Sequence, residues 1–177
     1  MWDVAGVEYA HQVHRPSSIP SGGRLLDASE QAALEREMEA IVTRSHLFKS
    51  LDDVGRQRLL ESGFVMRFDA GDVILREGDR GETMYLLMEG QVRIETSAPN
   101  GTLQLAELGR GACVGEVSVL TGSPRTATVT AITPVTAVTF ARHRILRLLD
   151  ENPKVRALLD TLVEARARDT VEKLIGS

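Results

Sequence analysis

The sequence predicts a mainly β domain with flanking helices, and three observations indicate this class. Between Phe64 and Phe140, short apolar runs are separated by glycine-containing turns, as in an antiparallel sheet that is closed or sandwiched. One of these turns contains Asn100-Gly101, a dipeptide that supplies the positive φ of tight hairpins. Helical periodicity is found before and after this region. We therefore expect an antiparallel β-roll or barrel and not an α/β domain.

Length and composition bound the domain organisation and the compartment. The 177 residues, of which 42% are hydrophobic, are enough for one globular domain with appendages. The formal net charge of -4 gives no electrostatic signature of nucleic-acid binding. The single cysteine, Cys113, excludes an intramolecular disulfide, and the sequence shows neither an apolar stretch that could span a bilayer nor an export signal. We expect a cytoplasmic protein that binds neither nucleic acid nor a membrane.

Residues 1–28 are predicted to form a flexible arm. Prolines, serines and a Gly-Gly pair occur there without sustained periodicity. His11 and His14 lie close together in this arm, but a metal site needs three or four ligands. We therefore expect no metal site in the arm.

Two helices are expected over residues 29–62. Asp27 and Glu30 have the spacing of a capping box, and the apolar residues that follow them recur at helical intervals. Ser50 with Asp53 can cap the second helix. A helical segment thus precedes the predicted strands.

The β-roll is expected over residues 63–141 and two further helices over residues 142–177. Asn152-Pro153 ends the first of these helices and begins the second, with asparagine as the cap and proline at the first helical position. The second helix carries an apolar stripe, which more often packs against a core or a partner than against a ligand. The stripe consists of Val155, Leu158, Leu159, Leu162 and Val163.

The residues that common enzyme sites require are not found in the predicted strand region. The histidines, at positions 11, 14, 46 and 143, all lie outside it, whereas cupin-type barrels carry their metal ligands on strands. The sequence also lacks a Gly-x-Ser-x-Gly elbow, a P-loop and a dinucleotide-binding glycine motif. We predict no enzyme activity, no metal and no cofactor. A cupin-like metalloenzyme stays open as an alternative, which bound metal in the purified protein would reveal.

The stretch GEVSVLTGSPRTATV, from Gly115 to Val129, has the groups needed to bind a sugar next to a phosphate. Gly115 precedes a predicted short helix, Glu116 to Leu120, whose N-terminal N–H groups can attract an anion. The Arg125 guanidinium can grip two phosphate oxygens, and the Glu116 carboxylate can accept a hydrogen bond from a sugar hydroxyl. Taken alone, such a pair is more often a solvated surface ion pair worth about 0–1 kcal/mol.

Two motifs resemble, in order and spacing, those of the cyclic nucleotide-binding domain family. Gly-Glu opens the phosphate-binding cassette of that family and Pro-Arg-x-Ala closes it, here over residues 115–127. Upstream, AGDVILREGDRGETMYLLMEGQV is similar to the glycine-rich signature of its β-roll. The resemblance covers about residues 45–160. It implies a jelly-roll-like β-roll, or double-stranded β-helix, with N-terminal helices and C-terminal hinge and lid helices.

The resemblance also implies which residues bind the ligand. Glu116 would accept a hydrogen bond from the ribose 2′-hydroxyl, and Arg125 would pair with the cyclic phosphate. Glu82 would orient that arginine, or else it is a solvated carboxylate in a turn. The base pocket is expected to be lined by Val73, Met84 and Leu86, and the cassette to contribute Gly115, Glu116, Val117, Ser118, Pro124, Arg125, Thr126 and Ala127.

Thr126 leaves the identity of the base open. The resemblance implies that threonine at this position is compatible both with members that bind cGMP and with members that respond to cAMP. Its hydroxyl can reach a guanine or donate to the phosphate. We expect cAMP as the ligand, with cGMP as the second choice and another nucleotide, such as a cyclic dinucleotide, as an alternative.

The resemblance implies a sensor or regulatory protein whose C-terminal helices respond to the ligand. The first of these helices would be the hinge, and Leu158, Leu159 or Leu162 of the second would cover the base. Because the sequence ends at Ser177 without a helix-turn-helix, we expect a protein effector, and a homodimer through the C-terminal helix is one route to it. A non-binding interaction module of the same fold is the alternative, which the Glu-Arg pair of the cassette disfavours.

Overall fold

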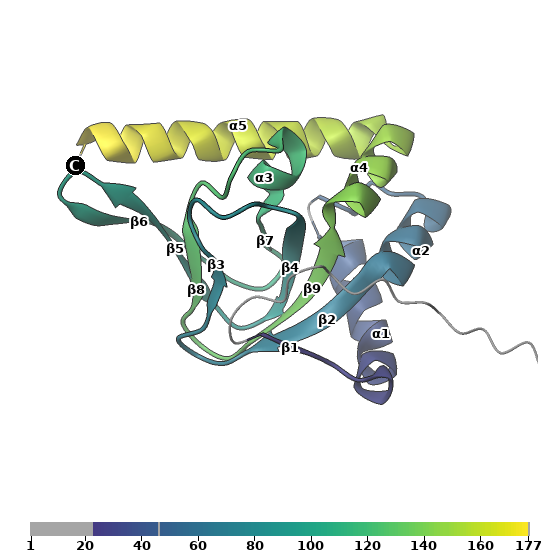
Figure 1. Cartoon of the computed structure of the whole chain (residues 1–177). Coiled ribbons are helices and arrows are strands. Elements are labelled where there is room, and N and C mark those ends of the chain that lie inside the picture. Colours follow the sequence, from purple (N-terminus) through teal and green to yellow (C-terminus); the bar gives the residue numbers. More distant parts are fainter. Residues whose placement is uncertain (1–22, 46, 177) are drawn as a thin grey trace, which may run out of the picture.

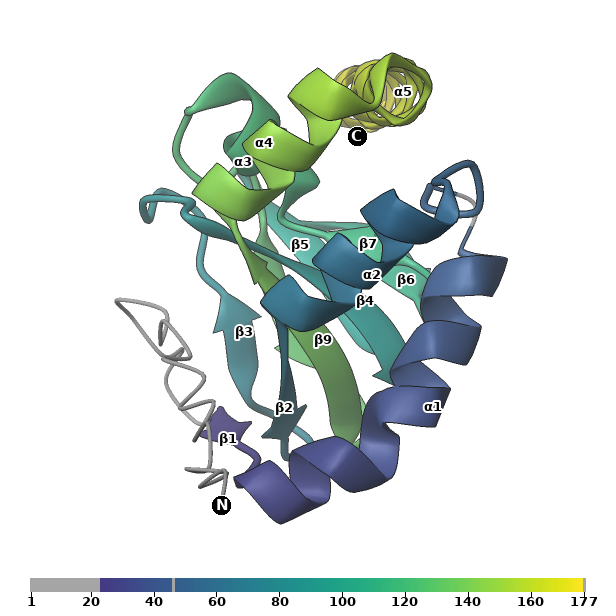
Figure 2. The same cartoon turned by 90° about the vertical axis from the view of Figure 1, so that its right-hand side faces the viewer.

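The computed structural model describes residues 23–45 and 47–176, which form two β-sheets with helices packed on them (Figures 1 and 2). The strands are β1 Arg24–Leu25, β2 Gly63–Phe68, β3 Val73–Leu75, β4 Thr83–Glu89, β5 Val92–Ala98, β6 Gly101–Leu108, β7 Cys113–Val114, β8 Thr128–Ala131 and β9 Val135–Ala141. The helices are α1 Ala28–Arg44, α2 Asp53–Ser62, α3 Glu116–Thr121, α4 Arg142–Glu151 and α5 Pro153–Gly176.

The two sheets face each other and enclose one hydrophobic core. The first sheet has the strand order β1-β2-β9-β4-β7 and the second β3-β8-β5-β6, and the paired strands are antiparallel. Tyr85 and Leu87 of β4 meet Val129 of β8 in this inter-sheet core. The prediction of an antiparallel β-roll with flanking helices is therefore confirmed.

A second core lies between the outer face of the first sheet and the helices. Side chains alternate across a strand, so Met84 and Leu86 of β4 point into this outer core while Tyr85 points into the other. Phe48, which precedes α2, meets Phe140 of β9 edge to face with ring centroids 6.0 Å apart. Figure 2 shows α1, α2 and α4 arranged around this face of the sheet.

The capping box predicted for the first helix is confirmed. Asp27 Oδ1 accepts hydrogen bonds from the N–H groups of Ser29 and Glu30, each at 2.9 Å. Glu30 Oε2 accepts one in return from the Asp27 N–H at 3.0 Å. Because the box satisfies N–H groups that have no partner inside a helix, it fixes the start of α1.

The cap predicted for the second helix is wrong by a short shift along the chain. The N-cap of α2 is Asp52, whose Oδ1 accepts a hydrogen bond from the Gly55 N–H at 2.7 Å. A capping side chain reaches the N–H of the second or third helical residue. Since α2 begins at Asp53, Asp52 has this spacing and Ser50 does not.

The predicted arm is too long at its C-terminal end. Arg24–Leu25 form β1, which pairs with Met66 and Arg67 of β2, and so belong to the folded part. A strand of two residues is too short to show periodicity in the sequence. The rest of the arm, residues 1–22 with both of its histidines, lies outside the described residues. In the part of the chain that the structure describes, no helix has the length and apolarity to cross a membrane.

The C-terminal helices extend from the outer core to the second sheet. Proline starts α5, as predicted, and Asn152 lies at its N-cap position, because the Asn152 carbonyl accepts a hydrogen bond from the Arg156 N–H at 3.1 Å. The Asn152 side chain donates to the Leu148 carbonyl at 2.8 Å and so also closes α4. Figure 1 shows α5 running past α3 towards the hairpin of β5 and β6. Near its end, Lys173 Nζ donates to the Leu105 carbonyl of β6. Helix α5 therefore lies over both the short helix α3 and the second sheet.

Candidate functional site

A tight turn between β7 and α3 forms the centre of the candidate site. Gly115 has φ +84° and starts α3, so the predicted short helix is confirmed. A methyl group on Gly115 would lie 2.7 Å from Arg125 Nη1 and 2.9 Å from the Thr83 carbonyl oxygen. Both the positive φ and these close approaches require glycine. Because Gly115 has no side chain, the turn can lie directly against the Arg125 guanidinium.

Arg125 is buried, with a relative exposure of 6%, and is held by backbone and hydroxyl oxygens. Its Nη1 donates to the Gly115 carbonyl at 3.0 Å, and its Nη2 donates to the Thr83 carbonyl at 2.7 Å and to Thr83 Oγ1 at 3.1 Å. Burial lowers the pKa of Arg125, although a guanidinium stays charged. A guanidinium has about five N–H donors, and these bonds use only part of them. A fixed cation with spare donors suits an anionic ligand.

Glu116 is fully buried, at 0% exposure, and its two carboxylate oxygens differ. Oε1 forms an ion pair with Arg166 of α5, whereas Oε2 is buried and has no hydrogen-bond partner among the described residues. Burial raises the pKa of this carboxyl, and the charge of Arg166 opposes that rise. A buried acceptor without a donor costs free energy unless something donates to it. A ligand hydroxyl that donates a hydrogen bond to Glu116 Oε2 would remove this cost.

Arg166 is a residue of the site that the sequence prediction missed. It anchors α5 to the cassette, because its Nη2 also donates to the Cys113 carbonyl at 2.7 Å. It lies in the polar stretch EARARD, yet it continues the buried face of Leu159 and Leu162 at helical spacing. That spacing is the signal that could have identified it. The neighbouring Cys113 thiol is buried, which raises its pKa to about 12, so it stays a protonated, unreactive thiol at neutral pH.

Met84 and Leu86 do not line the same space as Arg125, so their assignment to the base pocket is wrong. Both belong to the outer core beneath the helices. Thr83, which binds Arg125, and Tyr85 lie on the opposite face of β4, and the Thr83 hydroxyl donates to Tyr85 Oη at 3.4 Å. A shift of one residue along a strand exchanges its two faces.

The other predicted contact to the base, Val73, is half-buried on β3 and belongs to neither core. Leu75, from the same strand, comes nearer, since its Cδ1 would lie 3.2 Å from a methyl group on Gly115. Glu82 is exposed and forms no hydrogen bond with Arg125 in the described structure. Thr83 and Gly115 therefore orient the arginine, and Glu82 does not do so through a hydrogen bond.

The remaining cassette residues surround the reversal of the chain after α3. Ser118 is buried and its Oγ donates to the Pro124 carbonyl at 3.2 Å, which ties α3 to the loop before Arg125. Val117 and Ala127 are half-buried and Thr126 is exposed. The Thr126 side chain is therefore accessible at the edge of the site.

The three lid candidates fall on different faces of α5. Leu159 is fully buried in the outer core and Leu162 packs against that core, whereas Leu158 is 37% exposed. Because the Leu159 side chain is packed in the outer core, it has no exposed surface that could contact a base. Leu158 and the partly buried Leu162 have exposed surface and are the candidates that the arrangement leaves. Which of them covers a base remains a prediction.

Gly81, in the loop before β4, holds α3 close to Arg125, and its replacement is expected to damage the site. A methyl group there would lie 2.1 Å from Ser118 Cβ and 3.1 Å from Arg125 Nη1. Gly81→Ala should lower the free energy of unfolding by about 1–3 kcal/mol, as overpacking does, measured by urea denaturation. Gly109→Ala is the control, because its added carbon would approach no atom closer than 3.6 Å. Equal losses in the two variants would contradict the packing assigned to Gly81.

Other ligand chemistries find less support in the described residues. Across residues 23–45 and 47–176, no group of three His, Cys, Asp or Glu side chains is placed to hold a metal ion. His46 lies outside these residues, and His143 is exposed on α4. The polar groups that converge are those of Glu116, Arg125 and Arg166.

Comparison with known proteins gives consistent matches. The model of the cyclic nucleotide-binding domain family matches residues 65–152. The chain is 34% identical over 155 residues to lysophospholipase nte1 of Aspergillus fumigatus, a match that covers 85% of this chain and 10% of that protein. It is 28% identical over 138 residues to the CRP-like cAMP-activated global transcriptional regulator of Mycobacterium tuberculosis, covering 77% of this chain and 62% of the regulator.

A solved structure extends these matches to the fold. The N-terminal domain of a transcriptional regulator from Streptomyces coelicolor is 32% identical, with a TM-score of 0.59, over 75% of this chain and 93% of that domain. The chain spans about a tenth of the length of the fungal relatives, so what it shares with them is one segment.

Proposed function

Because the chain belongs to the cyclic nucleotide-binding domain family, we propose that it is a sensor or regulatory protein whose ligand is cAMP, with cGMP as the second choice. The observation that carries this proposal is the Glu116 carboxylate, fully buried with one oxygen lacking a donor, in the same cassette as the buried cation of Arg125. A cyclic nucleotide offers a hydroxyl and a phosphate on one rigid ribose, and it would satisfy both groups at once.

In the proposed complex each charged residue has a distinct role. The ribose 2′-hydroxyl donates to Glu116 Oε2, and the unused N–H groups of Arg125 donate to the cyclic phosphate. The carbonyls of Gly115 and Thr83 hold the guanidinium in place, so the ligand does not have to order it. The N–H groups of Gly115, Glu116, Thr126 and Ala127 complete the cradle. Val117, Ser118 and Pro124 fix the shape of the turn.

The preference for cAMP rests on the relative from Mycobacterium tuberculosis, which is described as cAMP-activated. The exposed Thr126 hydroxyl can donate to the phosphate or approach the base, and it is compatible with either purine. The base would lie on the side of β4 that carries Thr83 and Tyr85, next to Leu75.

The response to the ligand is proposed to travel from the cassette into α4 and α5. Arg166 ties α5 to Glu116, and Arg142 Nε of α4 donates to the Val119 carbonyl of α3 at 3.0 Å. A ligand can shift such an arrangement only as far as its affinity for the two states differs. We propose that the shifted helices are read by a protein effector in the cytoplasm and that this segment has no catalytic role.

A homodimer through α5 is a further part of the proposal. Ile175, Val171 and Leu174, near the end of the helix, are 82%, 53% and 36% exposed. Apolar side chains gathered on one helix are often covered by a partner. Sedimentation equilibrium with and without cAMP measures this directly.

The proposed function predicts a thermal shift. With cAMP at about a hundred times its dissociation constant, the fold should gain roughly 2.7 kcal/mol, which corresponds to a rise in Tm of about 5–10 °C. Titration calorimetry with cAMP and with cGMP then gives the two affinities. No heat and no thermal shift with either nucleotide would contradict the proposed function.

A further inference from the structure

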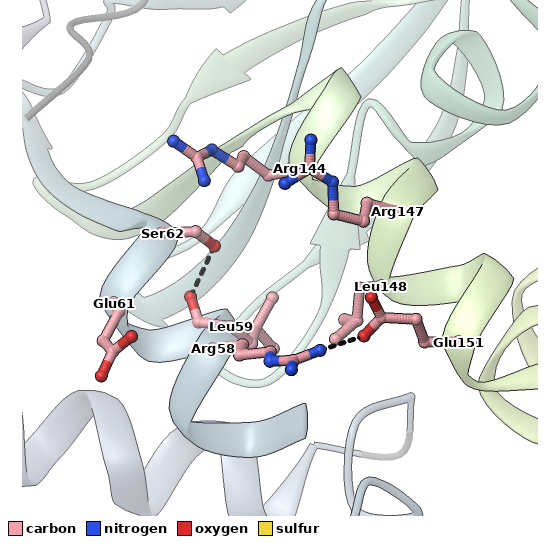
Figure 3. Close-up of a pocket in the computed structure, with 8 residues that line it drawn as sticks. All are labelled: Arg58, Leu59, Glu61, Ser62, Arg144, Arg147, Leu148 and Glu151. Carbon is pink, nitrogen blue, oxygen red and sulfur yellow. Dashed lines mark hydrogen bonds and ion pairs between the residues drawn. The ribbon is translucent and has the colours of Figure 1, made fainter. Parts of the chain in front are cut away.

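A cavity of about 500 Å³ between α2 and α4 lies outside the cassette (Figure 3). Four residues of α2 and four of α4 line it, and neither Glu116 nor Arg125 is among them. Leu59 and Leu148, which belong to the outer core, contribute to its wall. The cavity therefore lies between α2, which precedes the β-roll, and α4, which follows it.

The charges around this cavity are unevenly paired. Arg58 of α2 and Glu151 of α4 form an ion pair with each other, and Glu61 accepts a hydrogen bond from Gln57 at 3.0 Å. Figure 3 shows the Glu61 carboxylate turned away from Arg144 and Arg147. Neither acidic residue of the cavity is therefore paired with Arg144 or Arg147.

Arg144 and Arg147 have no hydrogen-bond or ion-pair partner among the described residues, and both are exposed. They lie three residues apart on α4, so their side chains share one face of the helix. Two neighbouring cations repel each other unless an anion lies between them. The chain has a net charge of -4, yet Arg144 and Arg147 lie together at the edge of the cavity without an acidic partner in the described part of the chain. An anionic ligand would neutralise these two charges.

The distribution of charge around the cavity indicates which class of anion it can bind. Glu61 and Glu151 border the cavity, so its field changes sign over a short distance. Such a field, on a chain that is acidic as a whole, disfavours a polyanion such as nucleic acid or an anionic membrane, which needs a uniformly basic face. It suits a short peptide segment that places carboxylates against the two arginines and an apolar side chain towards Leu59 and Leu148.

We propose that the cavity between α2 and α4 is the docking site of an acidic segment of a protein partner, with Arg144 and Arg147 binding its carboxylates. Helix α4 is joined to the cassette through the hydrogen bond from Arg142 to Val119, so a partner bound to α4 is in contact with the element next to the nucleotide. This deepens the proposed function and rests on it for the identity of the signal. If the partner prefers one arrangement of α4, cAMP changes its affinity and the partner changes the affinity for cAMP by the same factor.

The test uses the whole chain labelled with ¹⁵N and a synthetic helical peptide with glutamate pairs at i, i+3 spacing. Amide shifts confined to α2 and α4 are expected, and the same peptide with glutamine in place of glutamate should cause none. Arg144→Gln with Arg147→Gln should weaken peptide binding by about tenfold, because two exposed ion pairs with the peptide are lost together.

The matched control is Arg36→Gln with Arg168→Gln, which removes the same charge from exposed positions on α1 and α5. An equal loss of peptide binding in this control, or shifts spread over the whole surface, would overturn the proposal. Titration of cAMP into each double variant keeps the two hypotheses apart. If cAMP binds normally and the peptide does not bind the wild type, the docking site is wrong and the nucleotide site stands. If the peptide binds at α2 and α4 but no nucleotide binds, the reverse holds.

Discussion

Replacing Arg125 with glutamine is expected to lower the affinity for cAMP by at least about a hundredfold, because two charge-assisted hydrogen bonds to the phosphate contribute about 1.5–3 kcal/mol each. The loss should be larger than for an exposed arginine, since Arg125 is only 6% exposed and a buried phosphate would have no water to replace the guanidinium. Titration calorimetry of wild type and variant measures the difference.

Two further variants test whether the loss of cAMP affinity is caused by the loss of a guanidinium at position 125. Arg125→Lys keeps the charge but loses the planar fork, so an intermediate affinity is expected. Arg110→Gln removes another arginine that donates to a backbone carbonyl, that of Met88 at 2.6 Å, away from the cassette. It should leave the affinity unchanged. Normal cAMP binding by Arg125→Gln would place the site elsewhere.

The same substitution is expected to weaken the fold as well. Arg125→Gln leaves the Gly115 and Thr83 carbonyls and the Thr83 hydroxyl without their donors, at a cost of about 1–3 kcal/mol for buried groups of this kind. Affinities are therefore compared at a temperature where circular dichroism shows both proteins to be folded. Arg125 thus serves the ligand site and the packing of the β7–α3 turn.

The parts of the molecule that the sequence predicts best are those fixed by local rules. The capping box of Asp27 and Glu30 needs only neighbouring residues, and it is present as expected. The Gly115 turn and the short helix after it follow from a glycine at a position that requires positive φ. Most of the strands follow from short apolar runs between glycine-containing turns.

The parts that sequence predicts poorly depend on which residues meet across the fold. Met84 and Leu86 are apolar and lie in the right strand, but only the pairing of β4 with β9 and β7 decides which face points towards Arg125. Arg166 is far from Glu116 along the chain, and their ion pair depends on the path of α5 over α3. Local periodicity can place Arg166 on the buried face of α5, but it does not identify Glu116 as its partner.

The pairing of Glu116 with Arg166 links the charge state of the site to the position of α5. A carboxylate at 0% exposure is costly to ionise, and Arg166, whose side chain is 27% exposed, offsets part of that cost. Without that arginine the carboxyl would take up a proton more readily. Arg166 therefore helps to keep Glu116 an acceptor for a ligand hydroxyl while it holds the helix in place.

Glu116→Gln is expected to change how stability depends on pH. Burial raises the pKa of Glu116 above its ordinary value, so between the two values the folded state holds more protons than the unfolded state. The stability that Glu116 contributes is therefore present at low pH and is lost as pH rises through the folded pKa. Glutamine does not titrate, so the variant should gain stability relative to wild type as pH rises from about 4 to about 8, followed by urea denaturation at each pH. Each tenfold difference in the proton affinity of the carboxyl between the folded and unfolded states contributes about 1.4 kcal/mol to this gain.

Arg166→Gln is the counterpart and should act in the opposite direction. It leaves Glu116 buried without its cation, which is expected to cost about 2–3 kcal/mol at neutral pH, somewhat less than for a fully buried pair. Lowering the pH should restore much of this loss, because the protonated carboxyl needs no cation. Arg168→Gln, on the same helix but exposed, is the matched control and should be neutral at every pH.

The opposite result for Glu116→Gln would contradict the first of these two predictions. If that variant loses stability relative to wild type as pH rises, the ion pair with Arg166 stabilises the charged carboxylate by more than burial destabilises it.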